Sequence, residues 1–164
     1  MLSIVKHPSS ILKLSCDSVT SYDDELSMLV NGMIDAMYLN RGVGIAAPQV
    51  GVSRRVVIID PSGGEETGQL QVLINPRVTW RSSSTEMDSE GCLSLPGMVL
   101  QIERPDAIDV TFNDIEGVEH KMRCDGYKSR VIQHEIDHLD GILMFDHVGD
   151  LVRKLAMKNL RKNK

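Results

Sequence analysis

Residues 131–141, VIQHEIDHLDG, constrain the fold of this chain more than any other stretch. Apolar residues recur through and beyond it at helical spacing, at Ile132, Ile136, Leu139 and Leu143. In a helix, His134 and His138 are neighbours one turn apart, about 40° around the axis and nearly opposite the apolar stripe. We therefore predict a helix buried on two sides, with an apolar layer against one face and paired imidazoles on another.

The pattern H-E-x-x-H combines two metal ligands with a carboxylate, Glu135, that is placed to act as a base. The alternative is a solvated, charged helix whose histidines bind nothing. Catalytic zinc-type sites add a third protein ligand and keep one position for water. Met144 stands where a further histidine would follow Gly141, and the nearby downstream aspartates are too close in the chain. The third ligand is expected upstream.

Composition favours a single globular domain without a membrane segment. The chain has 164 residues, of which 41% are apolar, enough for one sizeable core. The N-terminal residues lack a long apolar run, and no segment approaches the length of a membrane span. Three widely spaced cysteines, Cys16, Cys92 and Cys124, imply no disulfide framework, so we expect a reducing cytoplasm. Taken singly, each cysteine is read as a small buried side chain.

The order of elements predicts an α+β fold. Ser21–Asp24 has the form of a helix start, and apolar residues from Leu26 to Tyr38 follow helical spacing up to residues 40–42. Strand-like runs then cover 54–60, 70–76, 78–83, 106–114 and 119–126, separated by turn-type clusters. We expect antiparallel sheets packed around a central metal-binding helix, with one helix near each end of the chain.

Two further segments are unusual for ordinary structure. GVGIAAPQVG, residues 42–51, surrounds Gln49 with glycines and alanines that let the backbone approach a ligand closely; a helix end followed by a turn is the alternative. EGCLSLPG, residues 90–97, holds Cys92. Together with QHEIDH, in this order and spacing, these segments resemble the three motifs of the peptide deformylase family. The resemblance covers nearly the whole chain.

The resemblance implies a metal-dependent hydrolase that removes the formyl group from nascent chains beginning with N-formylmethionine. It implies that Cys92, His134 and His138 hold the metal, that Glu135 is the catalytic acid and base, and that Gln49 and the backbone N–H of Leu93 stabilise the oxyanion. It further implies that Val43, Gly44 and Ile45 form an edge on which the substrate peptide pairs. Tyr127 and Val131 would line the methionine pocket. Glu90 and Arg104 would form an ion pair behind Cys92.

The expected cofactor is one divalent ion per chain. Two imidazoles and a thiolate suit Zn²⁺ and also Fe²⁺, Co²⁺ or Ni²⁺, and the resemblance points to Fe²⁺ in cells. We also expect a monomer. A general metallopeptidase and a structural Cys/His module remain as alternatives. Met98 and Val99 stand where the family often has a basic residue, and Tyr127 is expected to narrow or polarise the methionine pocket.

The last 17 residues reverse the charge of the chain. Residues 148–164 carry six Lys and Arg against one Asp, whereas residues 1–147 carry 12 against 22 acidic residues. We therefore expect a catalytic domain over 1–147 and a basic helical tail over 148–164. Val148, Leu151, Val152 and Leu155 are predicted to pack the tail on the domain, and Lys154, Lys158, Arg161 and Lys162 to face a polyanion such as ribosomal RNA. A solubilising terminus is the alternative.

Overall fold

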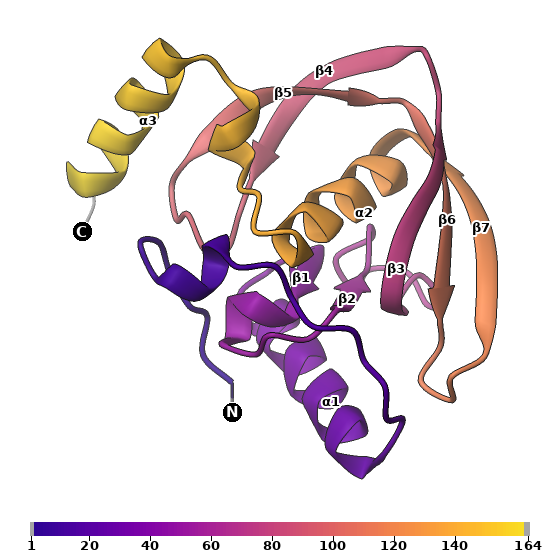
Figure 1. The fold of residues 1–164 in the computed structure, drawn as a ribbon. Helices are drawn as coiled ribbons and strands as arrows, with labels where there is room; N and C mark the ends of the chain where they lie inside the picture. The colour runs from indigo at the N-terminus through magenta and orange to yellow at the C-terminus, as the bar shows by residue number, and fades with distance from the viewer. Residues whose placement is uncertain (1, 163–164) are drawn as a thin grey trace.

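The computed structural model describes residues 2–162, and Figure 1 shows its helices and strands. The α-helices are α1 (Asp24–Leu39), α2 (Gly126–Leu139) and α3 (Asp150–Lys162). Short 3₁₀ turns cover Ser10–Lys13, Ala47–Val50 and Met144–His147. The strands are β1 (Gly44–Ala46), β2 (Val56–Ile59), β3 (Gln71–Arg81), β4 (Thr85–Gly91), β5 (Val99–Pro105), β6 (Ala107–Asn113) and β7 (Glu119–Asp125).

The strands form two antiparallel sheets. The larger has the order β1-β2-β3-β6-β7, so β1 is an edge strand, and the smaller is the hairpin of β4 and β5. Figure 1 shows α2 between the hairpin and the larger sheet, with α1 and α3 at separate ends of the molecule. The expected α+β arrangement around a central helix is confirmed.

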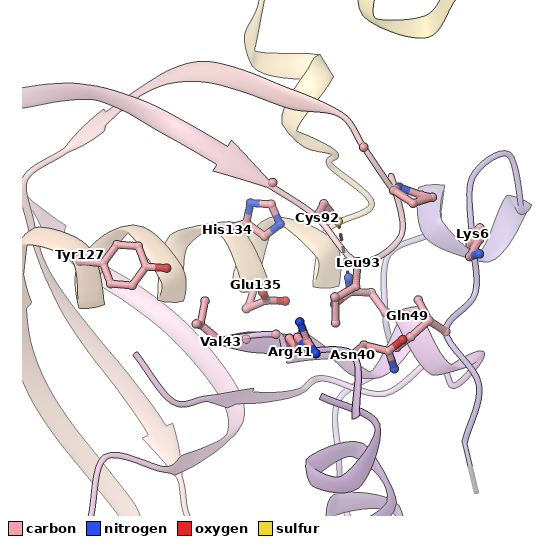
Figure 2. Close-up of a pocket in the computed structure, with 16 residues that line it drawn as sticks. Lys6, Asn40, Arg41, Val43, Gln49, Cys92, Leu93, Tyr127, His134 and Glu135 are labelled. Atoms are coloured by element: carbon pink, nitrogen blue, oxygen red, sulfur yellow. Dashed lines mark hydrogen bonds between the residues drawn. The ribbon is translucent and has the colours of Figure 1, made fainter. Parts of the chain in front are cut away.

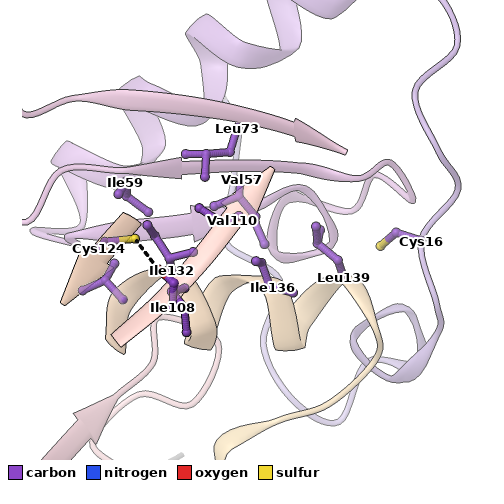
Figure 3. Close-up of a cluster of buried hydrophobic side chains, with 12 residues drawn as sticks. Cys16, Val57, Ile59, Leu73, Ile108, Val110, Cys124, Ile132, Ile136 and Leu139 are labelled. Carbon is purple, nitrogen blue, oxygen red and sulfur yellow. Dashed lines mark hydrogen bonds between the residues drawn. The ribbon is translucent and has the colours of Figure 1, made fainter. Parts of the chain in front are cut away.

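Helix α2 is held in the centre by its apolar stripe. Ile132, Ile136 and Leu139 are buried against side chains of β2, β3 and β6, such as Val57, as Figure 3 shows. Leu143, the last member of the predicted stripe, is also buried but lies beyond the end of the helix, in a second cluster around Phe145. The stripe therefore fixes which face of α2 points away from the sheet, and that face carries the histidines.

Helix α1 begins two residues later than the sequence predicted. Asp23, not Ser21, is the N-cap, and its carboxylate accepts a hydrogen bond from the backbone N–H of Leu26 at 3.0 Å. A cap must have its side-chain oxygen within reach of the first free N–H groups, and Asp23 satisfies this. The predicted end is confirmed, because Asn40 is the C-cap.

The strand predictions were right in place but incomplete. The runs at 70–76 and 78–83 are parts of one long strand, β3, which continues past Pro76 with irregular register toward β6. Strands β1, β4 and β5 were not predicted. Strand β1 is only three residues long and reads as a glycine-rich loop, and β4 is almost entirely polar, so neither shows the apolar alternation that marks a strand.

The tail forms the predicted helix, and Val148, one of the four side chains predicted to attach it, packs against the cluster around Phe145. Leu151 and Leu155 are exposed at 73% and 55%, and Val152 is exposed as well, so these residues do not attach the tail. Leu160 is instead buried at 6%, with Ala156 and Met157 partly buried beside it. The guanidinium of Arg153 also lies over the Phe145 ring. The side chains of Arg161 and Lys162 lie outside the described part of the chain. Among the described residues, no helix combines the length and apolar character needed to span a bilayer.

Candidate active site

The end of β4 and one face of α2 bring three metal-ligating side chains together. Cys92 follows directly after β4, and His134 and His138 stand one turn apart on α2. Their ligand atoms all lie within 4.8 Å of one another, and Cys92 Sγ is 3.3 Å from His138 Nε2. The two imidazole centroids are 5.1 Å apart, with the rings nearly perpendicular. The three predicted ligands are thus gathered by segments far apart in the sequence.

The donor set fits a divalent metal ion. His134 uses Nδ1 for a 2.8 Å hydrogen bond to Glu90 Oε2, which leaves its Nε2 to face Cys92. A carboxylate on the far nitrogen is the usual way in which a ligating imidazole is oriented. The Nδ1 of His138 is buried and has no hydrogen-bond partner among the described residues. One thiolate and two imidazoles leave the fourth tetrahedral position for water or substrate.

Charged groups behind the triad are fully buried and paired. Arg104 binds both oxygens of Glu90, through Nε at 2.5 Å and Nη2 at 2.9 Å. Arg130 donates a further hydrogen bond to Glu90 at 2.9 Å. Burial alone would raise the pKa of Glu90, but the hydrogen bonds from Arg104 and His134 hold it far below its usual range. Glu90 therefore keeps its negative charge and holds it next to Nδ1 of His134.

This network extends beyond the residues that the sequence predicted. Arg104 Nη1 donates to Asp137 Oδ2 at 2.9 Å, and His147 Nε2 lies 2.7 Å from the same oxygen. Asp137 is the fourth residue of the HEIDH run, and because it stands three residues after His134 its helical spacing could have indicated that it lies beside the metal ligands. His147 carried no sequence signal, because only the turn Met144–His147 folds it back onto α2.

The pKa values of the two buried histidines in this site are shifted in opposite directions. Burial lowers the pKa of His138 well below its usual value, and the charges of His134 and Arg104 act in the same direction. Burial also disfavours charge on His134, but hydrogen bonds with Cys92 and Glu90 outweigh it and raise its pKa. Since metal ligands must be deprotonated, the metal affinity of this site should depend on pH.

Glu135 lies beside the triad without belonging to it. Its side chain is buried, and its Oε2 has no hydrogen-bond partner among the described residues. Burial raises the pKa of this carboxyl to about 7. Gly44 leaves room for it, because a Cβ at that position would lie 2.5 Å from Glu135 Oε1. A carboxyl poised near neutrality can both accept and donate a proton.

Gln49 is the polar side chain that faces Cys92 from the glycine-rich segment. Its Oε1 accepts a 2.8 Å hydrogen bond from the backbone N–H of Ala46, which turns its Nε2 toward Cys92 Sγ at 3.5 Å. Nε2 also donates to the buried Ser94, which the sequence did not single out. Leu93 lies next to Cys92 on the wall of the same cavity. A fixed amide donor therefore points at the open side of the triad.

A cavity of about 570 Å³ opens onto this group, and Figure 2 shows the residues around it. Cys92, His134 and Glu135 line it together with Val43, Gly44 and Tyr127. A smaller recess of about 80 Å³ adjoins it, lined by Val43, Tyr127, Val131 and the buried Arg130, among others. Ile45 does not line the cavity, and its side chain is fully buried in the core.

The fold and these residues resemble those of known proteins. The family model for polypeptide deformylase matches residues 1–154. A peptide deformylase from Thermodesulfovibrio yellowstonii is 40% identical over 164 residues, covering 100% of this chain and 99% of its own length. A crystal structure of the peptide deformylase from Plasmodium falciparum superposes with a TM-score of 0.92 at 35% identity, covering 98% of this chain and 94% of the other. One from Legionella pneumophila gives 0.93 at 34%, covering 99% and 94%.

An α+β fold around a Cys/His/His group that fits a metal, with a buried carboxyl beside it, defines a metal-dependent hydrolase of amide bonds. Within that class, the chain belongs to the peptide deformylase family, as its motifs predicted. Enzymes of this family act on formylmethionyl peptides.

Proposed function

We propose that this enzyme removes formate from N-formylmethionyl nascent chains by water attack on the formyl carbon, with Glu135 as the proton carrier. The observation that carries the proposal is the buried, unpartnered Glu135 carboxyl beside the Cys92, His134 and His138 group at the cavity wall. A general metallopeptidase is less well supported, because the chain matches the deformylases over its length. A structural metal site would use four protein ligands, and the described residues bring three together.

Cys92, His134 and His138 would hold the ion. When bound, a divalent ion supplies Lewis acidity, which brings the pKa of a coordinated water from about 15.7 toward 7. We propose Fe²⁺ as the cellular metal, with Zn²⁺, Ni²⁺ and Co²⁺ as other ions that suit a thiolate and two imidazoles. Iron beside a thiolate in an open cavity is sensitive to oxygen, so the anaerobically loaded iron enzyme should lose activity in air over hours while the nickel form does not. Equal loss from both forms would argue against iron.

Glu135 would move the proton. Its pKa of about 7 lets it accept a proton from the attacking water and release the same proton to the departing amine. Burial keeps bulk water from competing for the proton, and Gly44 lets the carboxyl reach the cavity. The attack breaks the C–N bond of the formyl amide, so that the formyl CHO group and the water oxygen leave as formate. Both water protons end on the amine, one of them carried by Glu135.

Gln49 Nε2 and the backbone N–H of Leu93 would stabilise the negative charge that develops on the formyl oxygen. The hydrogen bond from Ala46 fixes the amide of Gln49 before substrate arrives, so no reorganisation is needed during the reaction. A donor of this kind contributes on the order of 3 kcal/mol to the transition state.

The peptide would bind as an added strand on β1. This strand is the edge of its sheet, and Val43 and Gly44 line the cavity there. The proposed pairing edge is the segment Val43, Gly44 and Ile45. Strand addition reads any sequence, so side-chain pockets must supply selectivity. The recess between Tyr127 and Val131 is the proposed methionine pocket, and the Tyr127 ring together with Arg130 makes it partly polar.

Formate release tests the reaction directly. Formate should accumulate from formyl-Met-Ala but not from unformylated Met-Ala-Ser. The peptide bonds between the residues of both peptides should stay intact. Cleavage of the unformylated peptide would identify a peptidase instead. Loss of formate release after chelation, and its return with added Fe²⁺ or Ni²⁺, would tie the reaction to the metal.

We further propose that residues 1–147 are the catalytic domain of a cytoplasmic monomer and that residues 148–164 dock it near the ribosomal exit. Three free cysteines suit a reducing compartment.

The tail presents exposed Lys154 and Lys158 to a polyanion, and its exposed Leu151 and Leu155 add apolar contact. Truncation after Leu155 would remove the buried Leu160, so charge reversal is the cleaner test. Lys154→Glu with Lys158→Glu should weaken ribosome co-sedimentation at low salt and leave formyl-Met-Ala hydrolysis unchanged; undiminished co-sedimentation would refute docking.

A further inference from the structure

The charged network behind the metal-ligating group ends at a histidine that has no role in the proposed chemistry. Nδ1 of His134 bonds to Glu90, and Glu90 is held by Arg104. The remaining nitrogen of Arg104, Nη1, donates to Asp137 Oδ2 at 2.9 Å. His147 Nε2 lies 2.7 Å from that same oxygen. A continuous series of contacts therefore joins the metal-ligating group to the turn before α3.

The contact between His147 and Asp137 has a defined direction. An ionised carboxylate only accepts hydrogen bonds, so Nε2 of His147 carries the proton and donates it. Asp137 Oδ2 thus accepts from Arg104 and from His147. Arg104 in turn interacts strongly with Asp137. Burial alone would lower the pKa of Arg104, but the hydrogen bond with Glu90 and the charge of Asp137 raise it.

Solvent reaches the outer end of this network through a second cavity. That cavity has a volume of about 310 Å³, and Arg104, Asp137 and His147 are among its lining residues. Among the described residues, none lines both this cavity and the one beside Cys92. The side chains of Asp137 and His147 are 20% and 32% exposed, whereas that of Arg104 is 5% exposed. Water can compete for a partly exposed carboxylate, and the hydrogen bond from His147 opposes that competition.

The turn that carries His147 has other attachments to the domain. Met144 and Phe145 of the same turn are each 2% exposed, within the cluster that also contains Leu160. Asp146 accepts a hydrogen bond from the backbone N–H of Leu143 at 2.8 Å. The turn is therefore held by its buried side chains and its own hydrogen bond, which leaves the His147 imidazole available for a separate task.

We propose that His147 is a positioning residue for the metal site. By holding the carboxylate of Asp137 on Arg104, it stabilises the guanidinium in the position that binds Glu90. Glu90 then keeps Nδ1 of His134 oriented. This role rests on the proposed function, in which His134 holds the metal. Removal of a group bonded directly to a ligating imidazole costs about 10–100-fold in metal affinity or activity, and His147 acts through three intermediates, so we expect a loss of about three- to tenfold.

Two amide variants that differ in reach test this role. His147→Gln carries an amide N–H at the ε position and can still donate to Asp137, whereas His147→Asn ends one bond earlier and cannot. The dissociation constant for Zn²⁺, measured by competition with a chelator, should stay close to the unmodified value in His147→Gln and rise about three- to tenfold in His147→Asn. The visible spectrum of the Co²⁺-loaded enzyme, which reports ligand geometry independently of activity, should shift in His147→Asn alone.

A second histidine of the chain provides the matched control. His120 makes the same kind of contact with Asp114, at 2.6 Å, on β7 and outside this network. His120→Asn should therefore leave the Zn²⁺ affinity and the Co²⁺ spectrum unchanged. In an Asp137→Asn background, His147→Asn should cause no further loss, because members of one hydrogen-bond network do not act additively.

Four results would contradict the proposals. Unchanged Zn²⁺ affinity and Co²⁺ spectrum in His147→Asn would overturn the positioning role, as would equal losses in His147→Asn and His147→Gln. A full additional loss when His147→Asn is added to Asp137→Asn would show that His147 does not act through that carboxylate. Undiminished Zn²⁺ affinity in His138→Ala would instead refute the proposed metal ligands.

Discussion

Glu135 is the residue on which the proposed reaction depends most directly. Because it does not belong to the metal-ligating group, we predict that Glu135→Gln keeps its metal and loses about 10²–10⁴-fold in kcat. Metal content by mass spectrometry and formate release should be measured on the same preparation. His138→Ala is the matched comparison and should lose metal as well as activity. A Glu135→Gln enzyme with normal turnover would remove this carboxyl from the mechanism.

The three cysteines should differ in reactivity when metal is removed. Burial raises the pKa of the Cys16 and Cys124 thiols, which keeps them in the unreactive protonated form. Cys92 is half-buried and lines the cavity. Chelation of the native enzyme should therefore expose one additional thiol to a disulfide reagent, and Cys92→Ser should abolish that increment. If chelation leaves the thiol count unchanged, Cys92 does not hold the metal.

We expect Arg104 to affect stability and the metal site by holding the carboxylate of Glu90 in place. Arg104→Ala removes two hydrogen bonds from a buried carboxylate and one from Asp137, so we predict a loss of about 3–5 kcal/mol in the free energy of unfolding. Because Glu90 orients His134, metal affinity or activity should also fall about 10–100-fold. Arg123→Ala, which removes an exposed partner of Asp109, is the control and should change neither property by much.

At the scale of elements, a single hydrogen bond joins the end of α1 to the segment after β2. The hydroxyl of Tyr38 donates to Asp60 Oδ2 at 2.6 Å, which raises the pKa of Tyr38 to about 12. The protonated phenol is the form that binds, so its stabilising effect is complete below pH 10 and is lost as the pH rises from about 10 to 12. Tyr38→Phe should cost about 1–3 kcal/mol at pH 8, by denaturant unfolding. The difference from the unmodified enzyme should shrink above pH 10; a constant difference would show that the hydroxyl contributes nothing through Asp60.

Helices and strands whose apolar residues recur at regular spacing could be predicted from the sequence, and those without such spacing could not. Helices α1 and α2 each place apolar residues every three or four positions, so their existence and buried faces could be predicted. Strand β4 has one buried residue, Glu90, and is specified by its pairing with β5 and by the ion pair that Glu90 makes with Arg104. Such a strand has no local signature, because its stability comes from partners elsewhere in the chain.

At the scale of the whole molecule, the helix of the tail is attached through Leu160 and not through the predicted Leu151 and Leu155. Leu160→Ala should destabilise the packing of α3 on the cluster around Phe145 by about 2–5 kcal/mol, because a buried side chain is lost. Leu155→Ala removes an exposed side chain and should change stability by less than about 0.5 kcal/mol. Hydrogen exchange of the α3 amides would separate the two. Equal protection in both variants would mean that Leu160 does not anchor the helix.

The sequence by itself determined the family, the central two-faced helix and the set of side chains around the metal site. Three short motifs carry that information, since H-E-x-x-H places both imidazoles on one face whatever surrounds the helix. Only the tertiary structure decided that His147 and Asp137 extend the network of Glu90 and that Leu160 anchors the tail. These contacts join segments that are far apart in the sequence. The spacing of residues within one segment predicts its helix or strand, but it does not predict which other segment that element will contact.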